Sequence, residues 1–111
     1  MGKDANALRK QILDAASVHP RVGALFRFNA GWFRAKTSTG TRPVEAGPIG
    51  WPDLAGWMAP LDGRLLLVEL KAGKDKLRQS QIEMLNNAKR DGCVVIVARS
   101  VKDFVRGVEE A

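Results

Sequence analysis

With 111 residues, of which 45% are hydrophobic and 27% charged, the chain has the length and composition of one globular domain spanning residues 1–111. Its 18 lysines and arginines outnumber its 12 acids, and the formal charge of +6 favours a polyanionic partner such as nucleic acid. The longest apolar run, residues 93–98, is too short to span a bilayer, and a single cysteine excludes an internal disulfide and a thiolate-rich zinc site. Charged residues within the first ten positions are atypical of a secretory signal, so we expect a cytoplasmic protein without a membrane partner.

The first third of the chain predicts a helix followed by two strands. Leu8, Ile12 and Ala15 recur at helical spacing, which predicts an amphipathic helix over residues 4–17. Pro20 ends it, because a residue before proline avoids the helical region. Short strands are expected next at 22–28 and 32–36, joined by a turn at 29–31.

Residues 37–50 are rich in Thr, Gly and Pro, so we expect an irregular loop there. A strand at 53–58, a turn at 60–63 and a strongly apolar strand at 64–71 follow.

The last third predicts helix, strand and helix. Ser80 and Glu83 have the spacing of a capping box for a helix over 78–89, and Ser100 with Asp103 caps a last helix that runs to 108. Between them, 94–98 is continuously apolar, as in a buried strand. The order α-β-β-β-β-α-β-α predicts an α/β fold with a mixed central sheet flanked by helices.

Three charged residues stand where two apolar strands begin or end. Alternation along 64–71 places Glu69 and Lys71 on one face, and burying either charge unpaired would cost several kcal/mol. If 53–58 and 64–71 form an antiparallel hairpin, Asp53 lies beside both of them. Two carboxylates, the Leu70 carbonyl and water would form an all-oxygen site for Mg²⁺ or Mn²⁺. A structural Asp53–Lys71 salt bridge explains the same spacing, and the residues alone leave both interpretations open.

Pro52-Asp53 followed by Glu69-Leu70-Lys71 resembles the PD-(D/E)XK nuclease signature. The surrounding sequence resembles the VRR-NUC branch, the virus-type replication-repair nucleases with small stand-alone phage and bacterial members. The similar stretches, in chain order, are GPIGWPD at 47–53, GKDKL at 73–77 before Gln81, and VARS at 97–100 after Gly92. The resemblance implies a restriction-endonuclease-like αβββαβ core, which fits the predicted order if the two early strands count as one bent element.

Carried over to this chain, the resemblance implies that Asp53 and Glu69 bind the Mg²⁺ or Mn²⁺ ion, with the Leu70 carbonyl as a further ligand. It implies that Lys71 positions or activates the attacking water and that Gln81 is the family's glutamine on the following helix. Many relatives also carry a glutamate on the first helix. Here residues 6–9 read NALR, leaving Asp4, or the later Asp14, as its replacement, or a site with two carboxylates.

Cations precede and follow the motif, and we expect them to contact DNA phosphates on either side of the cleaved bond. These candidates are Arg34, Lys36, Arg42, Lys74, Lys76 and Arg78. No recognition helix or zinc motif is evident, so recognition of DNA shape rather than of base sequence is expected.

Together these features predict a metal-dependent DNA endonuclease that hydrolyses phosphodiester bonds by in-line attack of water. Small stand-alone relatives resemble Holliday-junction resolvases, so branched DNA is the expected substrate and a homodimer the expected assembly, nucleoid-associated in a bacterial or phage-infected cell. Two alternatives are a flap or fork nuclease, and a basic nucleic-acid-binding module that is catalytically inactive.

Overall fold

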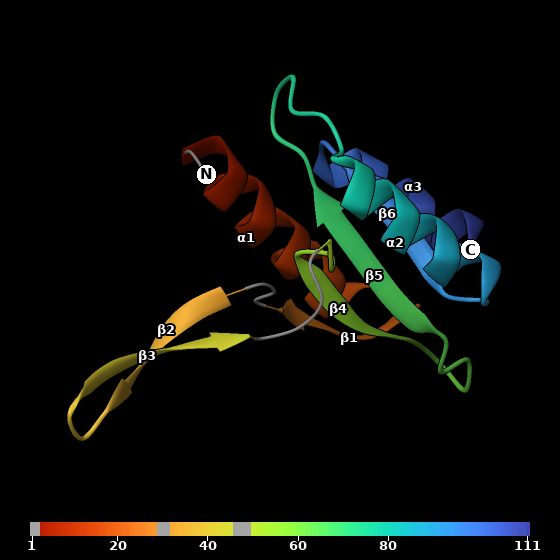
Figure 1. Ribbon diagram of the computed structural model, residues 1–111. Helices are drawn as coiled ribbons and strands as arrows, with labels where there is room; N and C mark the ends of the chain where they lie inside the picture. The colour runs from red at the N-terminus through yellow and green to blue at the C-terminus, as the bar shows by residue number, and fades with distance from the viewer. Residues whose placement is uncertain (1–2, 29–31, 46–49) are drawn as a thin grey trace.

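The computed structural model describes residues 3–28, 32–45 and 50–111, with side chains described at all of these positions except 3, 32–35 and 44–45. The described residues form three helices and six strands (Figure 1). In chain order these are α1 (Lys3–Val18), β1 (Val22–Arg27), β2 (Trp32–Thr37), β3 (Gly40–Glu45), β4 (Leu54–Met58), β5 (Leu65–Leu70), α2 (Gln79–Arg90), β6 (Val94–Ala98) and α3 (Val101–Glu110).

Four of the strands form a mixed sheet in the order β1-β4-β5-β6. β1 with β4 and β4 with β5 are antiparallel, whereas β5 and β6 are parallel because α2 carries the chain back between them. If β2 and β3 are left out, the elements from α1 to β6 follow the order αβββαβ, and α3 comes after them. The predicted α/β class, a mixed sheet flanked by helices, is confirmed.

The main core lies between this sheet and the helices α1 and α3 (Figure 1). Alternate residues of a strand point to opposite faces, so Leu66, Val68 and Leu70 of β5 enter this core while Leu67 and Glu69 face α2 on the other side. The helices contribute residues at helical spacing, among them Ile12 of α1 and Phe104 of α3, both fully buried. None of the helices in the described part of the chain combines the length and the apolar composition needed to cross a membrane.

The two early strands do not form one bent element. β1 belongs to the four-stranded sheet, but β2 pairs with β3 in a separate antiparallel ribbon (residues 32–45, hereafter the hairpin) that extends away from the sheet (Figure 1). The irregular loop expected at 37–50 is therefore wrong for Gly40–Glu45. Pro43 lacks an N–H and argues against a strand in a sheet interior, yet a two-stranded ribbon has free edges that accept it. The turn predicted at 29–31 lies outside the described residues.

The stretch from 28 to 53 leaves the four-stranded sheet and returns to it at one place. The backbone N–H of Phe28 donates a hydrogen bond of 2.9 Å to the carbonyl oxygen of Asp53. Arg27 is then paired with Leu54 in the β1–β4 ladder. The hairpin is thus an excursion between two strands that are already neighbours.

Replacing Phe104 with alanine tests the main core. This side chain is fully buried, and removing a phenyl ring from such a site costs about 3–5 kcal/mol because a cavity remains. Val18→Ala is the control, since Val18 is 82% exposed and its loss should change the free energy of unfolding by less than about 0.5 kcal/mol. Urea unfolding measures both; similar small changes for the two variants would contradict this description of the core.

Candidate active site

Glu69 and Lys71 lie at the end of the central strand β5, on the face that α2 covers. Both side chains are buried: the solvent-exposed fraction is 2% for Glu69 and 9% for Lys71. The backbone N–H of Lys71 donates to the Ala98 carbonyl of β6 at 3.1 Å, which extends the parallel ladder through this residue. Two ionisable side chains are therefore fixed on a rigid strand where little water reaches them.

Asp53 immediately precedes β4 and reaches the same place because β4 and β5 are antiparallel. Leu54 is paired with Val68, so the residue before β4 lies beside the end of β5. The Asp53 carboxylate accepts a hydrogen bond of 2.9 Å from the backbone N–H of Leu70. The carboxyls of Asp53 and Glu69 also interact directly. The juxtaposition expected from the hairpin geometry is present.

Gln81 brings the first turn of α2 onto this pair. Its side-chain N–H donates to Glu69 at 3.1 Å, and its side-chain oxygen accepts from the backbone N–H of Arg78 at 2.9 Å. The second bond satisfies one of the N–H groups that a helix start leaves unpaired. The expected capping box of Ser80 with Glu83 is wrong: the cap residue is Arg78, two residues before Ser80, and Gln81 is the third helical residue.

The electrostatics of Glu69 follow from this environment. Burial, followed by the hydrogen bond and the negative charge of Asp53, raises its pKa from 4.5 to about 9, and the positive charges of Lys71 and Arg78 only partly oppose the rise. Because this pKa lies above neutral pH, Glu69 is protonated in the cation-free protein. A positive charge placed between the two acids would displace that proton.

Lys71 is near both acids without being paired to either. Among the residues that the structure describes, no ion pair within 4.0 Å joins Lys71 to Asp53 or Glu69. The Asp53–Lys71 salt bridge considered from the sequence is therefore not formed. Its ammonium group instead adds a positive charge to the space in front of the carboxylates.

That space is an open pocket of about 410 Å³. Its lining joins the end of β5, the residue before β4 and the start of α2: Asp53, Glu69, Leu70, Lys71, Asp75, Lys76, Arg78 and Gln81. The structure thus gathers all the residues proposed from the sequence for catalysis and metal binding. Asp75 was not anticipated, and the signal that could have found it is an acid four residues after Lys71, in the basic segment that leads to α2.

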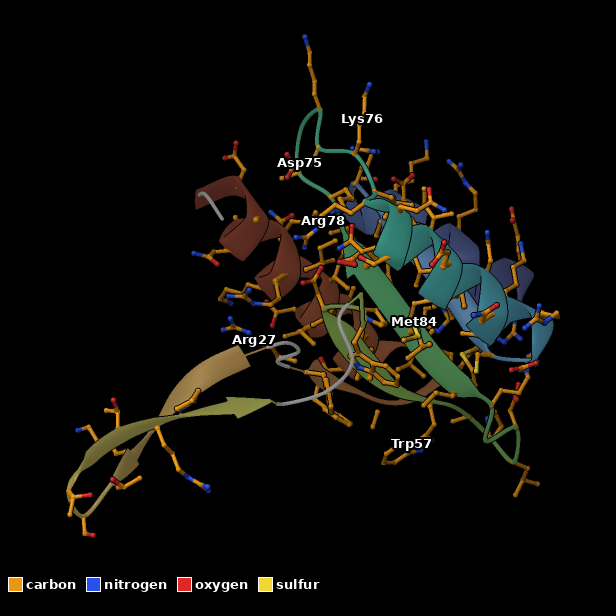
Figure 2. All side chains as sticks on the ribbon, viewed as in Figure 1. Arg27, Trp57, Asp75, Lys76, Arg78 and Met84 are labelled. Carbon is orange, nitrogen blue, oxygen red and sulfur yellow. The ribbon has the colours of Figure 1, made fainter. Side chains whose placement is uncertain are left out.

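The residues proposed to contact DNA fall into two groups. Lys74, Lys76 and Arg78 belong to the exposed connection between β5 and α2, and the last two line the pocket (Figure 2). Lys36 and Arg42 are exposed on the hairpin. Arg34 lies opposite Pro43 in the same ribbon, and its side chain is outside the described set.

The third acid expected on the first helix has no occupant at this pocket. Asp4 lines a different pocket, together with Gly73 and Arg99, and Asp14 pairs with Lys10 on the exposed side of α1. Within residues 3–28, 32–45 and 50–111, no three side chains of His, Cys, Asp or Glu are grouped as metal ligands. The donor set still fits a hard divalent cation, because two adjacent carboxylates and a backbone carbonyl supply only oxygen atoms.

The model of the VRR-NUC domain matches residues 29–102, which is more than half of the chain and includes every residue that lines the pocket. Among curated proteins no match is found.

The raised pKa of Glu69 predicts how stability depends on pH. The folded state keeps a proton that the unfolded state releases, so this contribution is complete below pH 4.5 and is lost as the pH rises toward 9. The melting temperature of the cation-free protein should fall over that range more steeply than that of Glu69→Gln, which has no proton to lose. Equal slopes for the two proteins in calorimetry would contradict the assignment.

Proposed function

The chain therefore belongs to the VRR-NUC domain family, nucleases of the PD-(D/E)XK type whose substrate is DNA, and we propose that it is a divalent-metal-dependent endonuclease that cleaves branched DNA. One observation carries the proposal: Asp53 and Glu69 meet in an open pocket that also holds Lys71. Paired carboxylates beside a lysine suit phosphodiester hydrolysis, because a cation held by the carboxylates and the ammonium group can both stabilise the negative charge that develops on the phosphate oxygens.

The proposed cation is Mg²⁺ or Mn²⁺, held by the carboxylates of Asp53 and Glu69 and by the carbonyl of Leu70. When bound, it supplies Lewis-acid stabilisation of the charge that develops on the phosphate. The hydrogen bond from the Leu70 N–H turns the Asp53 carboxylate toward β5 and so presents it beside Glu69. Gln81 fixes the Glu69 carboxyl from the other side.

Lys71 is proposed to position the attacking water. Its side chain lines the pocket and is buried, and its backbone is hydrogen-bonded to β6. The ammonium group is therefore kept close to the carboxylates. An ammonium group here can donate a hydrogen bond to a water aligned opposite the leaving oxygen and can stabilise the charge of the transition state. Arg78 and Lys76, at the pocket rim, are suited to hold the phosphates on either side of the cleaved bond.

Branched DNA is favoured over linear DNA as the substrate because the basic residues stand on two separate elements. The connection from β5 to α2 carries one group and the hairpin carries the other, which suits two duplex arms better than one continuous duplex (Figure 1). Resolving a four-way junction requires two symmetric cuts, so we propose a homodimer with one pocket in each protomer. Flap or fork cleavage is the near alternative, since such substrates also present two arms.

An inactive binding module is the second candidate function. Asp75 lines the pocket, but the described residues include no group of three acids placed to hold one metal ion, and Glu69 is protonated at neutral pH in the cation-free state. A protein of this kind would bind DNA through its basic groups without cleaving it.

Cleavage assays with three variants test the enzyme proposal. Labelled four-way junctions and linear duplexes are incubated with Mg²⁺, Mn²⁺ or chelator. Asp53→Asn, Glu69→Gln and Lys71→Ala should each lower the cleavage rate by about 100-fold or more, because each removes a group that acts on the transition state. Matched changes on exposed positions, Asp91→Asn, Glu83→Gln and Lys89→Ala, should leave the rate within about two-fold.

DNA binding by the three pocket variants should persist, as measured in chelator by fluorescence anisotropy. Wild-type protein that binds DNA but cleaves nothing with either metal would establish the inactive binding module instead. Equal rates on the junction and on the linear duplex would overturn the preference for branched DNA.

The homodimer predicts a mass of two 12.1 kDa chains for the free protein and of two chains on each four-way junction. Light scattering after size exclusion measures both. A single chain in each case would contradict the assembly.

A further inference from the structure

The outer part of the hairpin, residues 36–43, is basic and rich in hydroxyl groups. These residues read KTSTGTRP, and every one of them is exposed. They contain two cations, four hydroxyl side chains and no acid, and they belong to a longer stretch, residues 15–44, that contains five cations and no acid. The outer part contains no large apolar side chain. Such a surface suits the phosphates of a nucleic acid and offers nothing to an apolar protein surface.

The register of the ribbon places its two cations on opposite faces. Lys36 is paired with Thr41, and the next row pairs Ala35 with Arg42. Successive rows of an antiparallel ribbon point to opposite sides, so one cation projects from each face. Figure 2 shows side chains leaving the ribbon on both sides. A flat partner would meet only one of these charges, whereas a partner that encloses the ribbon meets both.

The β3 edge of the hairpin is not built to gain a third strand from another copy. A row of free backbone N–H and C=O groups along an edge invites strand addition, and a proline interrupts that row because it has no N–H. Pro43 lies within β3, opposite Arg34. A two-stranded ribbon is marginally stable in water on its own, so a partner that contacts its side chains would stabilise it.

We propose that the hairpin enters a groove of duplex DNA beside the cleaved bond, with Lys36 and Arg42 contacting the phosphate strands on opposite walls of that groove. The major groove is about 12 Å wide and admits a two-stranded ribbon. The hydroxyls of Thr37, Ser38 and Thr39 then lie at the leading end, where Thr37 is paired with Gly40 across a two-residue turn. This inference rests on the proposed function, because it assigns a role to the hairpin in holding the same substrate.

The two ends of the hairpin connect to neighbouring residues of the main sheet. Trp32 follows Phe28 by four residues and Glu45 precedes Asp53 by eight, and the Phe28 N–H is hydrogen-bonded to the Asp53 carbonyl. Asp53 lines the pocket, so a duplex bound by the hairpin is tethered to the pocket through the base of this excursion. The groove contact fixes the duplex while the pocket acts on a phosphate of the same molecule.

The experiment compares two double variants that lose the same charge. Lys36→Ala with Arg42→Ala removes the two hairpin cations; Lys89→Ala with Arg90→Ala removes two exposed cations at the opposite end of α2 from the pocket. Binding to a labelled duplex and to a four-way junction is measured in chelator over a range of salt concentrations. The hairpin variant should weaken binding about ten-fold at 0.1 M salt and reduce the log–log salt slope by about two, because two phosphate contacts are lost. The α2 variant should change affinity less than two-fold.

A methylation-interference experiment tests separately whether the hairpin enters the major groove. Methylation of guanine N7, which lies in the major groove, should interfere with binding of the wild type at a few positions next to the cleavage site, and that interference should vanish for the hairpin variant. A second pair, Lys36→Gln with Arg42→Gln, removes both charges but keeps polar side chains. It should reproduce the loss, because the charges rather than the shape of the ribbon make the phosphate contacts. Thermal unfolding of all variants should match the wild type, since these residues lie outside the core.

The outcomes separate this inference from the proposed function. If the wild type does not bind DNA, both are overturned. If it binds and cleaves DNA but the hairpin variant keeps the full salt slope, only the hairpin proposal falls. Equal losses for the two double variants would show an effect of net charge alone. Loss of dimer mass with unchanged DNA affinity would assign the hairpin to contact between copies instead.

Discussion

Glu69 stands at the end of the central strand with almost no surface in water, and the surrounding structure is arranged to accommodate its carboxyl group. Moving a bare charge to such a place costs several kcal/mol, so the group is held by a donor, placed beside a second acid and kept protonated in the absence of a cation. The donor is Gln81, which also satisfies the first turn of α2. One amide therefore links helix start and site: α2 cannot shift along the sheet without breaking the bond that orients Glu69.

The position of Glu69 at the end of the central strand also explains how a nuclease-type pocket can be built in a small domain. The central strand supplies Glu69, Leu70 and Lys71 as consecutive residues, and its antiparallel neighbour delivers Asp53 through backbone pairing alone. Only Gln81 depends on a helix packing against the sheet. The two carboxylates and the lysine are therefore fixed by hydrogen bonds between neighbouring strands, and α1 and α3 fill the core on the other face of the sheet.

The parts of this arrangement that follow from local periodicity could be predicted from the sequence. Strand alternation put Glu69 and Lys71 on one face, and a hairpin of known length put Asp53 beside them; both features are present. β3 was missed because Gly40 and Pro43 weaken the sequence signal for a strand. A strand tolerates proline only where it has a free edge, and no local sequence pattern reveals whether a strand has one. The helix itself was predicted to within one residue at each end, but its capping pair was misassigned because Arg78 is not a usual cap residue. The protonation of Glu69 was beyond prediction, since it depends on how deeply α2 covers a strand ten residues earlier in the chain.

The hydrogen bond between Phe28 and Asp53 closes the excursion of residues 28–53 at its base. A segment whose two ends already meet adds little closure entropy when it is lengthened, and the sheet that bears it is unaffected. Relatives could therefore diverge in this segment by insertion or deletion while the carboxylate pair and its lysine stay in place. The base of the excursion is therefore a suitable junction for chimaeras: exchanging the residues between Phe28 and Asp53 would exchange the proposed DNA-binding hairpin and keep the proposed catalytic residues unchanged.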